Sequence, residues 1–298
     1  MRRALGADVG ETLEPAIFAR VVAASADATD PTMEVEAEGT IYRLRVVSVY
    51  EFDSINLYGT DVTAARQVEV VSRENERLLL NILPSSIAER LRAGERVIAD
   101  GFDDMAVLFA DLVDFTEISS RLAPTDVVSL LNDVFSMCDR LADRFGLEKI
   151  KTIGDAYMVV GGLTEATGTG HEQSTGKHAA AVADMGLAIL DELGRHEHAG
   201  GTGLQVRVGM HVGPAVAGVI GLSKFIYDVW GDTVNMASRM ETTGVPGRLQ
   251  VARETYERLT DDFELEPRGI VDVKGKGPIE TWFVLGRRAA RGETTAPS

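Results

Sequence analysis

The first 66 residues show the spacing of one helix followed by strands. An amphipathic stretch from about Thr12 to Ala28 has helical spacing, and two strand-like segments follow it, around Thr32–Ala37 and Ile41–Tyr50. We therefore expect residues 1–66 to form a small α+β unit.

A heptad pattern comes next. The positions at intervals of three, four, three and four residues are Val68, Val71, Asn75, Leu78 and Ile82. A polar residue such as Asn75 in a seam fixes the register and favours a two-stranded state. We predict a signalling coiled coil within residues 67–100, with Pro84 ending the seam. A single amphipathic helix packed on its own domain is the alternative.

A larger domain is predicted over residues 101–287. It opens with the apolar run Met105–Ala110, which is typical of a strand buried on both faces. A helix from about Pro124 to Phe145 follows, and then two strands meet at a Gly154–Asp155 turn. A further helix ends near Leu193 and leads to a strand at Leu204–Met210. This βαββαβ order predicts an α+β, ferredoxin-like sheet with helices on one side.

The rest of the larger domain is assigned in the same way. A Gly/Thr-rich loop spans Thr164–Thr175, and a segment at Phe225–Gly231 leads to a helix from Asp232 to about Thr243. A closing strand pair is joined at Lys274–Gly277. Residues 288–298 are expected to form a disordered tail.

Charge restricts the possible partners. The 298 residues carry a formal net charge of −16, and the pI is near 4.8. Such a field repels polyanions, so we expect no general affinity for nucleic acid or for anionic membranes. A substrate with phosphates therefore needs cations placed locally.

The chain has one cysteine, Cys138, within an amphipathic helical pattern. It can form no intramolecular disulfide, and a reducing cytosol suits it best. No apolar run approaches the roughly 20 residues that span a bilayer, and no signal peptide is evident. We expect a cytoplasmic protein without membrane insertion.

Carboxylates at strand ends are the first candidates for chemistry. Asp111 and Asp114 follow the buried run, and Asp155 follows a glycine in the predicted hairpin. If that run is central and beside the hairpin, Asp111 and Asp155 lie at neighbouring strand ends. Two convergent carboxylates without a His/Cys cluster suit Mg²⁺ or Mn²⁺. Turn formation or helix capping is the alternative for each aspartate.

Cationic residues form the second group of candidates. Asn235 and Arg239 are four residues apart on one predicted helix face, and a guanidinium suits a transferring phosphate. Lys274 and Lys276 alternate with glycines in a turn that could approach phosphate oxygens. A surface ion pair is the ordinary alternative for Arg239, and a solvated turn is the ordinary alternative for Lys274 and Lys276. His211 is expected to be structural.

Taken together, four strings closely resemble class III adenylyl cyclases. They lie at residues 109–116, 148–158, 227–240 and 273–277, and they occur in the order of that family. The resemblance implies an adenylate cyclase catalytic domain over residues 101–287. Residues 82–91 resemble the helical transducer that precedes such domains, and residues 55–63 resemble the last strand and exit of a PAS sensor domain. A partial PAS-like unit over residues 1–66 is therefore expected.

The resemblance implies roles for particular residues. Asp111 and Asp155 would bind two Mg²⁺ or Mn²⁺ ions, and Lys151 with Asp228 would select adenine. The ions would serve an in-line attack of the ribose 3′ oxygen on the α-phosphorus of ATP, with pyrophosphate leaving.

Three more residues complete this set. Asn235 would orient the ribose, Arg239 would stabilise the transition state, and Lys274 would hold the terminal phosphates. The sequence departs from some family members at Pro214, where they place a basic residue that contacts phosphate.

A homodimer with shared sites is expected. Lys151 and Asp155 are four residues apart, yet their proposed targets lie at opposite ends of the nucleoside. One chain would supply the metal ligands and the other the remaining residues, giving two equivalent sites. A guanylate cyclase and a catalytically silent dimerisation or sensory module are the alternatives; the Lys151/Asp228 pair disfavours the first.

Overall fold

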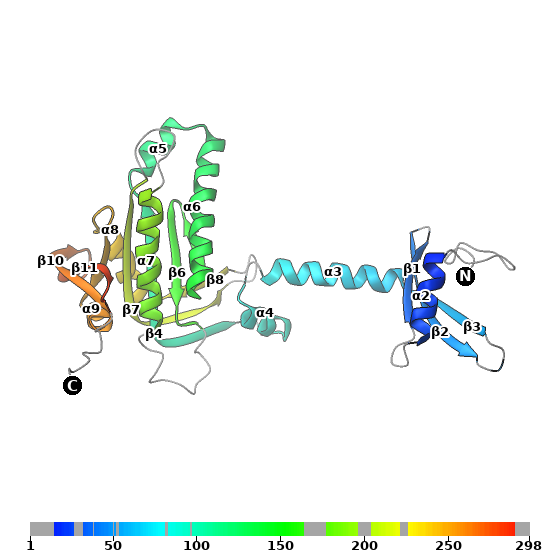
Figure 1. Cartoon of the computed structure of the whole chain (residues 1–298). Coiled ribbons are helices and arrows are strands. Elements are labelled where there is room, and N and C mark those ends of the chain that lie inside the picture. Colours follow the sequence, from blue (N-terminus) through cyan, green and yellow to red (C-terminus); the bar gives the residue numbers. More distant parts are fainter. Residues whose placement is uncertain are drawn as a thin grey trace, which may run out of the picture. The chain divides into compact units, whose positions relative to one another are not determined.

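The computed structural model describes residues 15–26, 32–37, 39–49, 51, 54–80, 83–95, 97–163, 177–195, 204–220 and 226–289, without the side chains of residues 26, 37, 49, 75–80 and 85–86. The chain divides into two compact units, Met1–Ala88 and Glu89–Ser298, and each is described by itself (Figure 1). The predicted loop at residues 164–175 and nearly all of the predicted tail lie outside the described residues.

The first unit contains the predicted helix and strands. It begins with α2 (Pro15–Ala26), followed by the antiparallel strands β1 (Thr32–Ala37), β2 (Thr40–Val49) and β3 (Ser54–Asp61) in the order β1-β2-β3. Its core consists of apolar side chains from α2, β1 and β2: Val21, Met33, Val35, Leu44 and Val46. The helix and three strands are as predicted, whereas the likeness to a PAS domain stays a prediction.

Helix α3 (Thr63–Leu80) is attached to this sheet at its first turns. Asp61 accepts hydrogen bonds from the backbone nitrogen and hydroxyl of Thr63 at 2.9 and 2.7 Å. Arg66 donates to Glu34 of β1 at 2.8 Å. These contacts fix where α3 leaves the three-stranded sheet, because both ends of each bond are held by secondary structure.

The predicted heptad seam begins on α3. Val68 and Val71 are 69% and 58% exposed, as seam positions of a single chain should be. The side chains of Asn75 and Leu78, and all of Ile82, lie outside the described residues. Helical structure resumes in α4 (Ser85–Arg92) and stops before residue 100, because Gly94 follows with a positive φ of 88°.

The second unit is built on one eight-stranded sheet. Its strands are β4 (Ile98–Leu112), β5 (Glu148–Ile153), β6 (Ala156–Gly161), β7 (Val206–Ile220), β8 (Ile226–Trp230), β9 (Leu249–Ala252), β10 (Phe263–Val273) and β11 (Gly277–Arg287). They run in the order β10-β11-β9-β7-β4-β6-β5, and β8 pairs with β7. The predicted βαββαβ unit is confirmed, with its first and last strands, β4 and β7, adjacent at the centre.

Among the described residues of this unit, five helices accompany the sheet. They are α5 (Phe115–Arg121), α6 (Pro124–Phe145), α7 (Lys177–Arg195), α8 (Asp232–Thr242) and α9 (Arg253–Leu259). Helix α6 matches its prediction, because a proline in the first turn and apolar residues at helical spacing mark it clearly. The short α5, α9 and β9 were not predicted, since four to seven residues carry little periodicity.

Helices lie on both faces of the sheet, so the expectation of helices on one side is wrong for α8. Leu108 of β4 and Met210 of β7 face the core beneath α6 and α7, which lie side by side in Figure 1. Gly209 faces the opposite way because side chains alternate along a strand. A Cβ at Gly209 would lie 1.9 Å from the backbone nitrogen of Glu241. Glycine therefore allows α8 to pack directly on β7.

The central strands are longer than predicted. The sequence predicts the last βαββαβ strand to end at Met210, but β7 continues through Pro214 to Ile220. The pairing of β4 with β7 is interrupted between Phe102 and Met105, opposite this proline. An irregularity removes the need for a ladder hydrogen bond from proline, which has no N–H.

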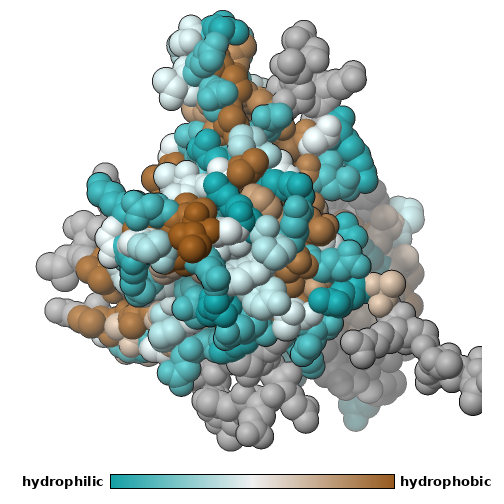
Figure 2. Space-filling model, turned by 90° about the vertical axis from the view of Figure 1, so that its left-hand side faces the viewer, coloured by the Kyte–Doolittle hydropathy of each residue, from teal (hydrophilic) through white to brown (hydrophobic). Residues whose placement is uncertain are grey.

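The surface of the larger unit is mixed in character. Figure 2 shows hydrophobic residues scattered among hydrophilic ones on the face that carries β10 and β11. The exposed large apolar side chains of these strands are Ile270 and Leu285. Among the described residues, no helix is long and apolar enough to cross a bilayer.

Candidate active site

The two predicted metal-binding aspartates line one cavity. Asp111 is near the end of β4 and pairs in register with Ala156, the residue after Asp155. The β5–β6 connection is tight because Gly154 adopts a φ of 63°. A cavity of about 610 Å³ at this end of the sheet is lined by Asp111, Asp155 and Arg207 together with residues of α5.

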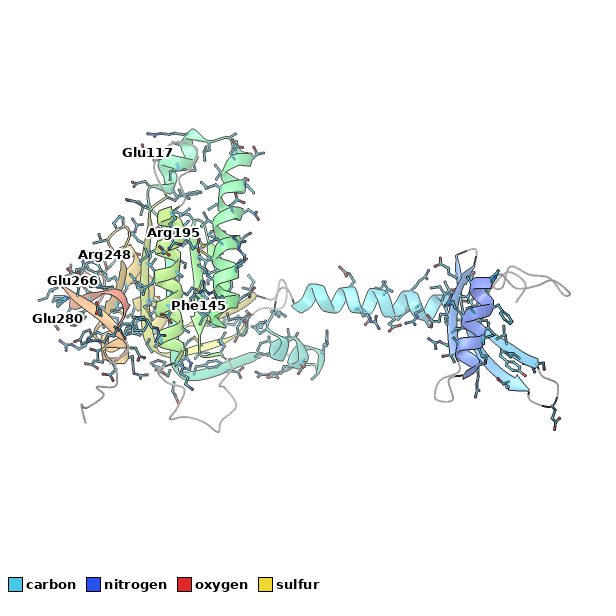
Figure 3. The ribbon with its side chains drawn as sticks, viewed as in Figure 1. Glu117, Phe145, Arg195, Arg248, Glu266 and Glu280 are labelled. Atoms are coloured by element: carbon cyan, nitrogen blue, oxygen red, sulfur yellow. The ribbon has the colours of Figure 1, made fainter. Side chains whose placement is uncertain are left out.

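Helix α5 forms one side of this cavity. Asp114 begins the helix in the left-handed region, with a φ of 56°, and its carbonyl accepts from the backbone nitrogen of Glu117 at 2.9 Å. Glu117 also lines the cavity, and Figure 3 places it at the end of the unit away from Phe145 in the last turn of α6. Asp114 thus has a local structural role, while its side chain remains beside the cavity.

Burial and nearby charges shift the pKa of the Asp111 carboxyl group. Burial raises its pKa to about 6, and the nearby carboxylates of Glu241 and Asp155 add to the rise. Arg207 acts in the opposite direction through its charge and its hydrogen bond. A place where nearby negative charges raise the pKa of Asp111 is one where an additional cation would bind favourably.

Arg207 and Glu241 are members of this site that sequence reasoning missed. Arg207 of β7 lies opposite Asp111 in the strand pairing, and its Nη2 donates to Asp111 Oδ2 at 2.8 Å. Its Nε donates to Glu241 Oε1 in the last turn of α8 at 3.0 Å. The only signal in the sequence is a charged residue within an otherwise apolar strand, which does not name its partner.

The donor set agrees with a hard divalent cation. Asp111 and Asp155 offer carboxylate oxygens to one cavity. No group of three or more His, Cys, Asp or Glu side chains among the described residues is arranged to hold a metal by itself. Two carboxylates with the remaining positions left to water and substrate phosphates are the usual arrangement for Mg²⁺, so these residues fit such an ion.

The predicted adenine-selecting residues form an ion pair. Lys151 Nζ of β5 lies 2.5 Å from Asp228 Oδ2 of β8, although 77 positions separate them in the sequence. The side chain of Lys151 is 32% exposed and that of Asp228 is 16% exposed. The backbone nitrogen of Val229 donates to Asp228 Oδ1 at 2.8 Å and fixes the carboxylate. A donor and an acceptor are therefore held together at a partly open position.

The remaining predicted residues lie on α8 and on the β10–β11 turn. Asn235 is exposed and Arg239 is half-buried on α8, and Lys274 is exposed in the turn. Lys276, rather than Lys274, contacts α8, through an ion pair with Asp232 at 2.7 Å. Within the described residues, no hydrogen bond or ion pair joins Asn235, Arg239 or Lys274 to either cavity aspartate.

The start of α8 is also fixed, and the neighbouring histidine is buried. Thr233 Oγ1 donates to the carbonyl of Pro214 at 2.6 Å, which ties the helix to β7. His211 is 7% exposed, and burial lowers its pKa. A neutral, buried imidazole beside Thr255 agrees with the structural role expected for it.

A comparison with known families agrees with this fold. Residues 97–286 match the family described as the adenylate and guanylate cyclase catalytic domain. The match covers more than half of the chain. The chain therefore belongs to this family, and the predicted membership of the class III cyclases is confirmed.

Individual relatives include both kinds of cyclase. An adenylate cyclase of Mycobacterium tuberculosis is 47% identical over 230 residues, which are 76% of this chain and 50% of that protein. The chain thus spans about half the length of this relative. The guanylate cyclase domain of RhGC from Catenaria anguillulae, in complex with GTP, is 34% identical with a TM-score of 0.57, covering 63% of this chain and 99% of that one. The adenylyl cyclase CyaB from P. aeruginosa is 26% identical with a TM-score of 0.56, covering 64% and 97%.

Proposed function

We propose that this protein is an adenylate cyclase that converts ATP to 3′,5′-cyclic AMP and pyrophosphate. The observation that carries the proposal is the ion pair between Lys151 and Asp228, because it supplies the donor and the acceptor that adenine requires. In the reaction the ribose 3′ oxygen forms a bond to the α-phosphorus, the bond to the pyrophosphate oxygen breaks, and the hydroxyl proton passes to water.

Base selection follows from the chemistry of the pair. The ammonium group of Lys151 donates to N1 of adenine, and the carboxylate of Asp228 accepts from the 6-amino group. Guanine has a carbonyl at position 6 and a proton on N1, so both contacts would be mismatched. Mismatched polar groups in a binding site give strong discrimination between substrates.

The cavity at the end of β4 supports the role of Asp111 and Asp155 in holding divalent ions, for which we propose two Mg²⁺ or Mn²⁺. When bound there, such ions activate the attacking hydroxyl and neutralise phosphate charge. Arg239 neutralises charge that builds on the α-phosphate, Asn235 orients the ribose, and Lys274 binds the terminal phosphates. Exposed or half-buried positions of these three side chains leave them free to contact a ligand.

We further propose a homodimer with two shared sites. The cavity aspartates and the α8 residues have no direct bond within the described part of one chain, which supports their use in two different sites. Val68 and Val71 of α3 present an apolar face that a second copy would cover in a coiled coil. Residues 1–66 then act as a regulatory unit, residues 67–100 as the connection, and residues 101–287 as the catalytic domain.

Product analysis tests the proposal directly. The whole 298-residue chain is incubated with ATP or with GTP in the presence of Mn²⁺ or Mg²⁺, and the nucleotides are separated by chromatography. Cyclic AMP as the main product supports the assignment. Cyclic GMP would instead make this chain a guanylate cyclase, and no cyclic product with either nucleotide would favour a silent dimerisation module.

A further inference from the structure

Arg207 lies between two carboxylates on the face of the sheet that carries the candidate metal site. The pairing of β4 with β7 places it directly opposite Asp111, so both side chains leave the same face. Its two donors are divided: Nη2 contacts Asp111 at 2.8 Å, and Nε contacts Glu241 at 3.0 Å. One guanidinium therefore bridges a proposed metal ligand and a carboxylate that has no assigned role.

Glu241 is held near Asp111 by their shared partner, because both carboxylates accept from the one Arg207 guanidinium. The side chain of Glu241 is 10% exposed. The close approach of the α8 backbone to Gly209 fixes the helix turn that carries Glu241. Glu241 is therefore a further acidic group beside Asp111, in addition to Asp114 and Glu117, which line the cavity.

We propose that Arg207 is a positioning residue that determines which carboxylates bind the metal ions. It holds Asp111 in place, and it engages Glu241 so that this carboxylate does not become a third ligand beside Asp111 and Asp155. The inference rests on the proposed function, in which those two aspartates hold divalent ions.

The number of carboxylate ligands affects how strongly the metal ion acts on the substrate. Carboxylate number tunes the affinity of a site for hard cations, so a third one binds an ion more tightly. An ion whose charge is already neutralised by the protein polarises the substrate less. Arg207 thus keeps the ion available to the phosphates and the attacking hydroxyl.

Mn²⁺ binding separates this role from a merely structural one. The whole 298-residue chain is titrated with Mn²⁺ in the presence of 3′-deoxy-ATP, which lacks the attacking hydroxyl, and free Mn²⁺ is measured by electron paramagnetic resonance. We expect Arg207→Met to lower the Kd for Mn²⁺ by about tenfold, because Glu241 joins the ligands. With ATP, kcat should fall by roughly 100-fold, because Asp111 is no longer held in place.

A double variant tests whether Glu241 causes the tighter Mn²⁺ binding that is expected of Arg207→Met. In Arg207→Met with Glu241→Gln, the third carboxylate is gone, so the Kd for Mn²⁺ should return to within about threefold of the unmodified protein while kcat stays low. Arg207→Lys keeps the positive charge and should recover part of kcat. Arg287→Met is the matched control: it breaks an ion pair with Asp184 of α7 and should change neither quantity.

The results that would overturn the role of Arg207 differ from those that would overturn the metal assignment. Weaker or unchanged Mn²⁺ binding in folded Arg207→Met would overturn the inference. If that variant does not fold, Glu241→Gln alone decides, since a loss of about tenfold in Mn²⁺ affinity would show that Glu241 is already a ligand. Asp111→Ala tests the proposed function separately: Mn²⁺ binding equal to that of the unmodified protein would remove the metal assignment, whatever Arg207 does.

Discussion

Exchanging the base-selecting pair is the sharpest test of substrate choice. Replacing Lys151 with Glu and Asp228 with Ser reverses the pattern that the site offers. Glutamate accepts from N1–H and the 2-amino group of guanine, and serine donates to the carbonyl at position 6. The two original side chains are 2.5 Å apart on β5 and β8, so both substitutions act on the same end of the bound base.

The size of the effect follows from the exposure of the pair. Removing a hydrogen bond to a charged group costs about 1.5–3 kcal/mol. Lys151 and Asp228 are 32% and 16% exposed, so water can replace part of what is lost, and the lower end of that range applies. Two such losses amount to about 3 kcal/mol, which corresponds to roughly a 150-fold fall in kcat/KM for ATP.

The assay compares kcat/KM for ATP and for GTP under the same Mn²⁺ concentration. We expect kcat/KM for ATP to fall and that for GTP to fall far less or to rise. The control is Lys149→Glu with Asp139→Ser, which breaks a 2.7 Å ion pair between β5, the strand that carries Lys151, and α6, away from the proposed base contacts. Equal losses for both nucleotides in the folded Lys151/Asp228 variant would show that the pair is structural rather than selective.

Three further predictions concern assembly and stability. Asp111→Ala and Arg239→Ala chains should each be inactive, and mixing them should restore about a quarter of the normal activity, because half of the dimers then contain one intact site; confirmed subunit exchange without activity would contradict shared sites. His211 is neutral in the folded state because burial lowers its pKa, so stability is complete above its unfolded pKa of about 6.5 and decreases as the pH falls below it. His211→Gln should flatten the dependence of the unfolding midpoint on pH between 7 and 5, and an unchanged slope would assign that dependence to other groups. Gly209→Ala should destabilise the larger unit by about 3 kcal/mol or more in urea unfolding, whereas Gly101→Ala, whose Cβ meets nothing within 4 Å, should not; equal stability of the two variants would refute the close contact with α8.

Much of the fold could be predicted because its signals are local. The helix at Pro124–Phe145 has a proline start and an apolar stripe of sufficient length, and the strand at Met105–Ala110 is a continuous apolar run. Short elements such as α5 and α9 could not be found in this way. The extension of β7 beyond Met210 was missed because Pro214 is normally a reason to end a strand, and its tolerance depends on the pairing with β4.

The candidate site, like the fold, can be predicted only in part from the sequence. Motifs and positions at strand ends predict Asp111, Asp155, Lys151 and Asp228 as site residues without any knowledge of their contacts. Only the structure shows that Lys151 contacts Asp228, because the bond joins strands that are far apart in the chain. Roles in metal binding and catalysis stay predictions that the proposed experiments test.

The sequence alone determined what depends on neighbouring residues: the order of the longer helices and strands, the motifs of the cyclase family and the residue types available for chemistry. Tertiary structure alone decided that α8 covers the second face of the sheet and that Arg207 joins Asp111 to Glu241. Hydrophobic periodicity reports which side of an element is buried, but it carries no information about which distant element covers that side. Strand register and the close packing at Gly209 supply that information, because they place side chains from β4, β7 and α8 within hydrogen-bonding distance.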